Sequence, residues 1–327
     1  MKSILVFSNG EKIGDGIIKL PLLNEIKKRL PDFKITWMTD KGNTVYNGAL
    51  KKISSNYIDE IYEKANINIL FWKKISPNYN LEGKYFDYIF DTQKSIVRTI
   101  ALKRIKHNFF ISGSARCAFS SIKLKKGLIN KKKYYLENLF DLLDLIAKGE
   151  VDDDFKIPVN DNLKLKVSQI LNRNIQYVGI APGAGEKNKI WPINNFIDIA
   201  DYCYKKRYGI VFFIGPEELD LKTLLSKRFP FSIFIEDNDK LKEFSNIEII
   251  MATTNFLKLA ISNDSGVSHM LSTNECPLIK LFEPKDSNKF TPNKKNLFTI
   301  SSKDFNSTNI ADIPVSLVIN RIENIIN

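Results

Sequence analysis

The chain alternates between two hydrophobic patterns, and this alternation limits its fold more than any other feature. Short apolar runs such as residues 3–7 and 176–181 are followed by stretches whose apolar side chains recur every three or four positions. The first pattern predicts a buried strand and the second an amphipathic helix. Strands that alternate with helices form a parallel sheet with helices on both faces. The sequence therefore predicts an α/β fold.

The alternation is interrupted once, at residues 149–158. This segment carries Asp152–Asp154 and no apolar periodicity, so it is predicted to be a solvated linker rather than a metal-binding site. We expect two doubly wound, Rossmann-like domains facing each other across a cleft, at residues 1–155 and 156–310, followed by a C-terminal helix in residues 311–327. Ligands of such sheets bind beyond the carboxyl ends of the strands.

The same patterns place each element along the chain. The expected strands are residues 3–7, 33–38, 58–62, 88–91, 107–111, 176–181, 210–214, 232–235, 256–261 and 278–282. The expected helices are residues 17–30, 43–52, 95–104, 134–147, 194–206, 217–228, 246–253, 265–272 and 312–326.

The composition is that of a globular protein without a membrane span. Hydrophobic residues make up 43% and charged residues 26% of the chain, and no apolar run approaches the roughly 18 residues that a membrane span requires. The three cysteines lack metal-ligand or redox spacing, and two histidines are too few for a zinc site built from several histidines. We therefore expect a cytoplasmic protein with no bound metal.

The formal charge of +12 indicates either an anionic partner or a compositional bias. Lysines cluster at residues 123–133, where they would suit an anionic membrane surface, a phosphorylated glycan or nucleic acid. A genome biased towards Lys, Asn and Ile would decorate a solvated surface in the same way. Because no nucleic-acid recognition pattern stands out, we expect no nucleic-acid partner.

Two glycine-containing clusters follow predicted strands and indicate a phosphate site. One is Asn263-Asp264-Ser265-Gly266-Val267-Ser268-His269, where a strand passes through a polar turn into a helix start. Backbone N–H groups at such a start attract an anion together with the helix dipole. The other contains Pro182-Gly183-Ala184-Gly185 and adds Lys187 and Lys189. The pair predicts a diphosphate site and therefore a nucleotide ligand.

Some of these side chains have a structural alternative. Lys189 would neutralise a phosphate or merely decorate the surface, and His269 would contact a ligand or pack in the core. Glu218 would bond a ribose or simply interact with a helix dipole. The glycines are only part of a dinucleotide fingerprint, because Asn188 occupies the third glycine position. No Walker A sequence occurs.

Gly14-Asp15-Gly16 lies just after the first predicted strand, at the carboxyl edge of the N-terminal sheet. An aspartate at a helix start is commonly an N-cap. The functional alternative is a carboxylate that accepts a proton from a substrate hydroxyl. The glycines would let a substrate approach closely, or would only permit the turn. Asp264 has the same two interpretations.

The order of these clusters resembles glycosyltransferase family 9, the ADP-heptose:lipopolysaccharide heptosyltransferases. The resemblance covers nearly the whole chain. It rests on Gly14-Asp15-Gly16-Ile17-Ile18-Lys19-Leu20-Pro21, Leu30-Pro31, Tyr88-Ile89-Phe90-Asp91-Thr92-Gln93, Pro182-Gly183-Ala184 with Lys189-Ile190-Trp191-Pro192, Gly215-Pro216-Glu217-Glu218, Asn263-Asp264-Ser265-Gly266 with His269, and Leu281-Phe282 with Pro284.

This resemblance implies a GT-B fold and an inverting, metal-independent sugar transfer from a nucleotide donor. It implies that Asp15 is the general base and that Lys189 stabilises the departing diphosphate. The residues that it assigns to substrate binding are Gly14, Gly16, Ala184, Gly185, Glu218, Asp264, Ser265, Gly266, Val267 and His269.

The resemblance also implies the partners. The donor would be ADP-heptose, a co-substrate needing no further cofactor, and the acceptor an anionic lipopolysaccharide core glycolipid. The enzyme would then work in the cytoplasm, in peripheral contact with the inner membrane. The C-terminal helix of the family packs back on the first domain, which is the expectation for residues 311–327.

The sequence departs from the family pattern at three positions. Ala184 and Gly185 stand where many members carry hydroxyl side chains, and Glu283 stands where the Leu-Phe-Gly-Pro segment has glycine. These departures concern the donor sugar more than the reaction. Two alternatives stay open: a nucleotide-sugar-binding protein in which Asp15 is only a helix cap, and another GT-B enzyme such as a sugar epimerase.

Overall fold

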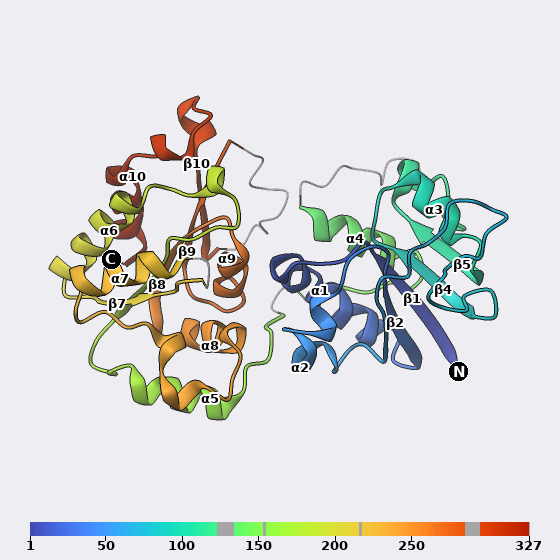
Figure 1. Cartoon of the computed structure of the whole chain (residues 1–327), viewed down its shortest axis with the longest axis horizontal. Coiled ribbons are helices and arrows are strands. Elements are labelled where there is room, and N and C mark those ends of the chain that lie inside the picture. The colour runs from blue at the N-terminus through green and yellow to red at the C-terminus, as the bar shows by residue number, and fades with distance from the viewer. Residues whose placement is uncertain (123–133, 153–154, 216–217, 285–294, 327) are drawn as a thin grey trace. The chain divides into compact units, whose positions relative to one another are not determined.

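The computed structural model describes the chain except for residues 123–133, 153–154, 216–217, 285–294 and 327. Its contacts divide the chain into two units, Met1–Phe155 and Lys156–Asn327. Each unit contains one five-stranded sheet, and every pair of neighbouring strands in the two sheets is parallel (Figure 1). The predicted α/β class with two Rossmann-like halves is confirmed.

The first sheet has β1 at its centre. Ile4, Leu5 and Val6 of this strand have no exposed surface, because both faces of the sheet are covered and the strand is apolar without alternation. The order of the sheet is β3-β2-β1-β4-β5. Its strands are β1 (Lys2–Ser8), β2 (Phe33–Thr39), β3 (Glu60–Tyr62), β4 (Tyr85–Asp91) and β5 (Lys106–Ser112).

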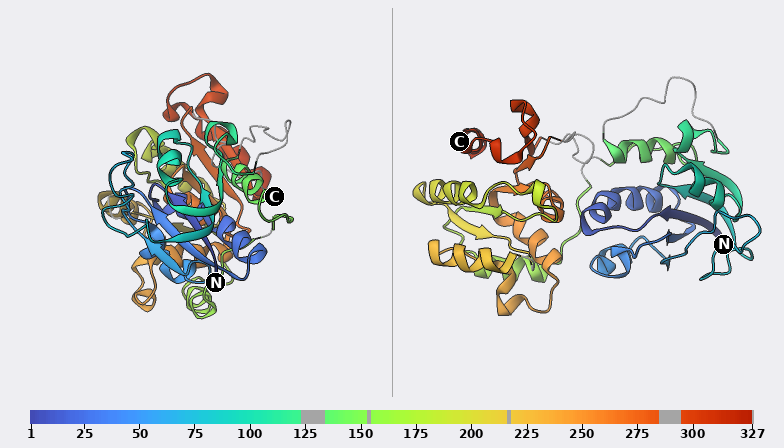
Figure 2. Two further views of the ribbon diagram at one scale, coloured as in Figure 1. Left: turned by 90° about the vertical axis from the view of Figure 1, so that its right-hand side faces the viewer. Right: turned by 45° about the horizontal axis from the view of Figure 1, so that its top comes forward.

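Different elements cover the two faces of the first sheet. On one face α4 packs against α1, as Figure 2 shows. On the other, Leu5 and Phe7 belong to one buried cluster with Ala101 and Leu102 of α3. The helices of this unit are α1 (Ile13–Arg29), α2 (Lys51–Ser54), α3 (Ile96–Leu102) and α4 (Tyr135–Leu143), with short 3-10 helices at Val45–Asn47 and Ser114–Cys117.

The second sheet repeats this arrangement with the order β10-β9-β8-β6-β7. Its strands are β6 (Tyr177–Ala181), β7 (Gly209–Phe212), β8 (Leu257–Asn263), β9 (Leu278–Phe282) and β10 (Leu297–Ser301). All five residues of β6 and of β9 are buried, as expected for interior parallel strands. The carboxyl ends of β6 and β8 therefore lie side by side.

Helices flank the second sheet in two groups. α10 packs against α6, and α8 packs against both α5 and α9. Val318 and Ile322 of α10 are buried in one cluster with Trp191 and Phe196. The helices of this unit are α5 (Asp161–Ile170), α6 (Ile193–Lys205), α7 (Leu219–Arg228), α8 (Asn246–Thr253), α9 (Gly266–Leu271) and α10 (Val315–Ile326).

The C-terminal helix α10 belongs to the second unit, and its packing on the first domain stays a prediction. The apolar side of α10 packs against α6 and β8 of its own unit, and Tyr202 Oη donates a hydrogen bond of 2.7 Å to Glu323. Among the described residues, no helix is both long and apolar enough to span a membrane.

Candidate functional site

Two loops leave neighbouring strands of the second sheet and carry the predicted glycine clusters. Residues 182–192 follow β6, and residues 264–266 follow β8, which pairs with β6. The buried side chain of Asn263 joins the two loops. Its amide nitrogen donates to the carbonyl of Pro182 at 2.6 Å, and its oxygen accepts from the Trp191 N–H at 3.1 Å. The structure therefore brings the two clusters together at the carboxyl edge of this sheet.

Three basic side chains gather beside these loops. Lys280 of β9 is buried and forms an ion pair of 2.7 Å with Asp264, while Lys189 forms one of 3.0 Å with Glu186. Burial lowers the pKa of His269 well below its usual range, and the charges of Lys280 and Lys189 lower it further. His269 is therefore neutral at pH 7, and the two lysines supply the positive charge. Lys280 could not be predicted from the sequence, because a lysine within an apolar strand gives no sign of its partner.

The helix start after β8 offers two backbone donors. The N–H of Ser265 is already bonded to the Ser268 hydroxyl in a capping box. Within the described chain, the N–H groups of Gly266 and Val267 have no hydrogen-bond partner. A Cβ atom built on Gly266 or on Gly185 would meet open space. An anion can therefore approach these amides without displacing a side chain.

Glu218 lies against the first glycine loop. A Cβ atom on Gly183 would be 1.8 Å from Oε1 of Glu218, so the carboxylate lies directly against this glycine and would have to move if a side chain were introduced there. Oε2 of Glu218 accepts a hydrogen bond of 3.0 Å from the Gly215 N–H. Burial raises the pKa of the nearby Glu236 to about 7, and the charge of Glu218 adds to the rise. No motif in the sequence marks Glu236.

Asp15 stands in the first turn of α1, in the first unit, and is not the helix cap. The N-cap residue is Lys12, which makes no side-chain capping bond. Asp15 is exposed, and its carboxylate makes no hydrogen bond or ion pair with the part of the chain that the structure describes. Gly14 and Gly16 beside it are buried. A Cβ on Gly16 would lie 2.4 Å from Val45, so this glycine permits α1 to pack closely.

A hollow of about 270 Å³ lies at the carboxyl edge of the first sheet, beyond β4 and β5. Asp91, Lys94, Arg116 and Tyr135 are among its lining residues. The hydroxyl of Tyr135 donates to the carbonyl of Thr92 at 3.0 Å. Burial raises the pKa of Tyr135 to about 12, and the charge of Asp15 contributes to the rise. The charge of Asp15 therefore acts on a hydroxyl that lines this hollow.

The model of the family described as glycosyltransferase family 9 (heptosyltransferase) matches residues 78–313, which is most of the chain. The chain belongs to glycosyltransferase family 9. This family 9 chain is therefore a glycosyltransferase, and the enzyme class predicted from the sequence is confirmed.

Individual relatives agree with the family. Lipopolysaccharide heptosyltransferase 1 of Campylobacter coli is 25% identical over 321 residues, 91% of this chain and 90% of that protein. A family 9 glycosyltransferase structure from Veillonella parvula has a TM-score of 0.73 at 19% identity, covering 99% and 97% of the two chains. The structure of the heptosyltransferase WaaC of E. coli with ADP has a TM-score of 0.66 at 15% identity and covers 99% of each chain. The GT-B fold is confirmed.

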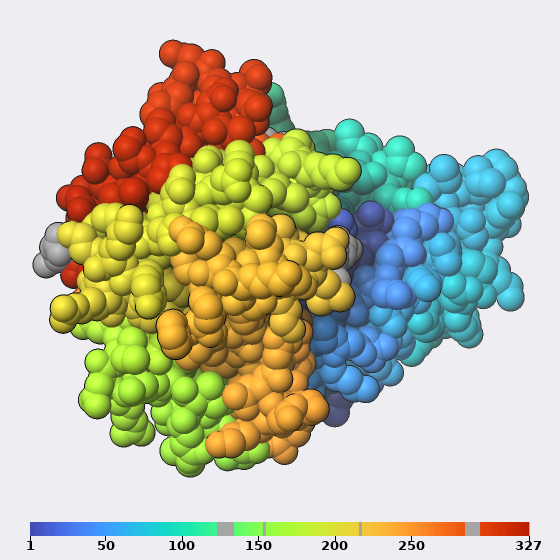
Figure 3. Space-filling model, turned by 60° about the vertical axis from the view of Figure 1, so that its left-hand side comes forward, coloured from blue at the N-terminus to red at the C-terminus, as the bar shows by residue number. Residues whose placement is uncertain are grey.

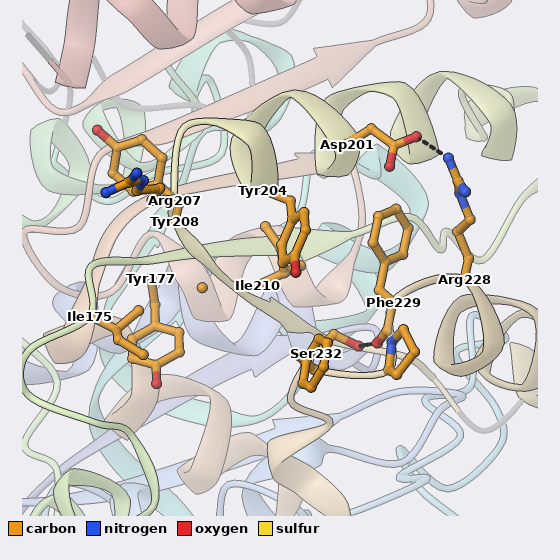
Figure 4. A pocket seen from close by; sticks show the side chains of 13 residues that line it. Ile175, Tyr177, Asp201, Tyr204, Arg207, Tyr208, Ile210, Arg228, Phe229 and Ser232 are labelled. Carbon is orange, nitrogen blue, oxygen red and sulfur yellow. Dashed lines mark hydrogen bonds and ion pairs between the residues drawn. The ribbon is translucent and has the colours of Figure 1, made fainter.

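A larger hollow of about 650 Å³ lies at the other edge of the second sheet of this family 9 enzyme (Figure 4). Tyr177 and Gly209, which line it, are the first residues of β6 and β7. An ion pair of 2.7 Å between Arg228 and Asp201 closes one side. Since the two glycine loops follow the carboxyl ends of the strands, this hollow is not part of the candidate site that those loops form.

The described residues contain no group of three or more His, Cys, Asp or Glu side chains arranged to hold a metal ion. Asp152 belongs to the connecting segment, where its N–H donates to Glu25. Asp153 and Asp154 lie outside the described residues, as does the lysine cluster at residues 123–133.

Proposed function

We propose that this glycosyltransferase moves a heptose from ADP-heptose to a lipopolysaccharide core acceptor, with inversion at the anomeric carbon. The observation that carries the proposal is the joining of the loops after β6 and β8 beside Lys189 and Lys280. Two cations and two unpaired amides suit a diphosphate. The name of the Campylobacter coli relative and the ADP in the WaaC structure support the same substrates.

Each residue of the second unit has a proposed part in holding the donor. Lys189 and the N–H groups of Gly266 and Val267 bind the diphosphate, and the buried Lys280 of β9 adds positive charge. Glu218 accepts hydrogen bonds from the ribose. As the bond from the anomeric carbon to the diphosphate breaks, negative charge grows on the departing ADP. Donors that are already oriented towards this charge lower the barrier most effectively.

Asp15 is proposed as the general base on the acceptor side. An acceptor hydroxyl attacks the anomeric carbon from the face opposite the diphosphate, and Asp15 takes the hydroxyl proton. An exposed carboxylate without a hydrogen-bond partner in the described chain is free to do so. Lys94 and Arg116, which line the hollow beyond β4 and β5, would bind an anionic group of the acceptor.

The donor site is tested by calorimetry with ADP and adenosine. Lys189→Ala should weaken ADP binding by roughly ten- to a hundred-fold, corresponding to a charge-assisted contact of about 1.5–3 kcal/mol, and leave adenosine binding unchanged. Lys205→Ala is the control, because Lys205 is an exposed lysine of the same unit at the last position of α6. Equal losses for ADP and adenosine would place Lys189 away from the phosphates.

The reaction itself is tested with ADP-heptose and a delipidated core oligosaccharide. Transfer should continue in excess EDTA, since lysines and amides supply the positive charge, and the anomeric configuration of the product follows from its NMR coupling constants. Retention of configuration would contradict the single displacement. Tight binding of ADP-heptose without turnover would instead support a nucleotide-sugar-binding protein.

A further inference from the structure

A segment without a helix connects β3 to β4 and covers part of the first sheet. Parallel strands are usually joined by a helix, but residues 63–84 contain neither helix nor strand. Ala65, Ile67 and Ile75 are buried in the same cluster as Leu5 of β1. Both ends of this segment are therefore anchored in the core.

Between these buried positions the segment projects outward. Ile69, Phe71 and Trp72 are 48%, 66% and 79% exposed, and Lys73 and Lys74 follow directly. The light-blue lobe at the right edge of Figure 3 includes this segment. Exposed aromatic side chains gathered on one short segment are unusual on a surface that faces only water.

The projecting segment is held in place by arginines of the neighbouring helix. Arg98 pairs with Asp40 at 2.9 Å and donates to the carbonyl of Ile67. Arg104, just after α3, donates to a series of carbonyls, those of Asn68, Leu70, Phe71 and Lys73. The exposed apolar tip is therefore part of an ordered surface.

The outward face of α3 continues this apolar surface. Ile96, Val97 and Ile100 are all exposed. Ile96 and Ile100 are four residues apart and Arg104 follows after four more, so the three lie on one side of the helix. Because Arg104 contacts the projecting segment, the apolar side of α3 borders it. We call Ile69, Phe71, Trp72, Ile96, Val97 and Ile100 the apolar patch.

The two segments that form the apolar patch carry only basic charges, with Glu82 and Asp40 beside them: the charges of Lys74 and Arg104 lower the pKa of Glu82, and Asp40 pairs with Arg98. Residues 64–81 and 93–106 contain no acidic residue. Their basic residues are Lys64, Lys73, Lys74, Lys94, Arg98, Lys103, Arg104 and Lys106. An apolar surface whose own segments carry an excess of basic side chains is complementary to a bilayer with anionic headgroups, which attract each basic side chain near the membrane surface.

We propose that the apolar patch inserts into the headgroup region of an anionic bilayer and holds the enzyme at the membrane. This proposal rests on the proposed function, since a glycolipid acceptor resides in such a bilayer. Trp72 and Phe71 enter the interface, where aromatic rings are favoured, while Lys73 and Lys74 stay among the phosphates. The patch belongs to the unit that carries Asp15, so it brings the acceptor side of the enzyme to the lipid.

Trp72 provides its own probe. The chain has three tryptophans, and Trp37 and Trp191 are both fully buried. A change in tryptophan emission on binding therefore reports on Trp72. Vesicles of phosphatidylethanolamine and phosphatidylglycerol should shift the emission to the blue and protect it from acrylamide, and vesicles of phosphatidylcholine alone should not. A shift that grows with protein concentration in the absence of lipid would show self-association and overturn the proposal.

Variants then test the patch by vesicle flotation. Phe71→Ser with Trp72→Ser should lower binding to the anionic vesicles at least tenfold, and Lys73→Gln with Lys74→Gln should lower it several-fold and weaken its salt dependence. Phe231→Ser is the control, since Phe231 is an exposed phenylalanine of the second unit. An equal loss with Phe231→Ser, or no loss with Phe71→Ser and Trp72→Ser, would overturn the proposal.

An assay with a delipidated acceptor separates this inference from the proposed function. The Phe71→Ser, Trp72→Ser variant should keep wild-type turnover on the delipidated oligosaccharide and lose turnover on the acceptor embedded in vesicles. Absence of transfer by the wild-type enzyme would refute the proposed function but leave the vesicle measurements to decide on the patch. Equal turnover of the variant and the wild type on the embedded acceptor would refute the membrane role.

Discussion

The ammonium group of Lys280 lies 2.7 Å from Oδ1 of Asp264, and the lysine side chain is only 3% exposed. Burial lowers the pKa of Lys280, and Asp264 opposes this by favouring the charged form. The pair links β9 to the loop after β8, next to the amides of Gly266 and Val267. Asp264 therefore has a structural partner, and its proposed contact with the donor must be shared with Lys280.

Substituting first Lys280 and then both members of this ion pair should distinguish its effect on the free energy of unfolding from its effect on ADP binding. Lys280→Met leaves the Asp264 carboxylate without its partner and should lower the free energy of unfolding by about 3–5 kcal/mol. Adding Asp264→Asn should recover most of this stability. The double variant should still bind ADP weakly, because the positive charge is missing. Urea unfolding and calorimetry measure the two effects, and full recovery of ADP affinity would show that the nucleotide does not use the charge of Lys280.

Asp15→Asn should reduce transfer by about 10²–10⁴-fold, since an amide cannot accept the acceptor proton. ADP affinity should not change, because the proposed donor residues all belong to the second unit. Asp32→Asn is a suitable control, as Asp32 is another exposed carboxylate of the first unit and precedes the amino end of β2. Steady-state rates with saturating donor would decide. Wild-type turnover in Asp15→Asn would remove the general base from the mechanism.

Gly16→Ala should lower the stability of the first unit by about 1–3 kcal/mol, because the new methyl group would lie 2.4 Å from Cγ2 of Val45. The same packing places the Tyr46 hydroxyl 2.7 Å from the carbonyl of Gly16, so α1 and Asp15 with it should shift. Val45→Ala removes the obstructing methyl groups. Thermal unfolding of the double variant should show partial recovery, and a simple sum of the two single losses would contradict direct contact.

The hydrophobic alternation predicted most of the fold because parallel strands covered on both faces leave continuous apolar runs. The prediction failed where contacts with distant parts of the chain determine the local secondary structure. The expected strand 232–235 is reduced to a single bridge between Val211 and Ile233. The expected helix 43–52 became a 3-10 helix and the four-residue α2, since the chain there packs closely against Gly16.

The hydrophobic pattern did not predict two of the elements. β10 is short and includes the polar residues Thr299 and Ser301, so it lacks the continuous apolar run by which the other strands are predicted. α5 begins in the polar connecting segment, where Asn160 caps it through its side chain. In the candidate site, the glycine clusters were visible in the sequence, but Lys280 and Glu236 were not. Their importance comes from burial and from neighbours that are distant in the sequence.

The environment of Asp91 also depends on burial and on neighbours that are distant in the sequence. Its raised pKa predicts that the stability of the protein depends on pH. Burial raises the pKa of this carboxyl to about 6, although Thr99, Ser112 and the Gln93 N–H all donate hydrogen bonds that favour the charged form. An unfolded chain would titrate Asp91 near about 3.9. Between these two values the folded protein keeps a proton that the unfolded chain has lost.

The contribution of Asp91 to stability is therefore complete below about pH 4 and is lost as the pH rises through about 6. The difference of about two pH units corresponds to about 3 kcal/mol. Asp91→Asn cannot titrate, so its stability relative to the wild type should rise across this window. The free energy of unfolding of both proteins is measured by urea titration at a series of pH values. The difference between the two proteins cancels the contributions of the other carboxyl groups. A wild-type-minus-variant difference that stays constant from about pH 4 to pH 7 would mean that the Asp91 carboxyl has the same pKa in the folded and unfolded chain.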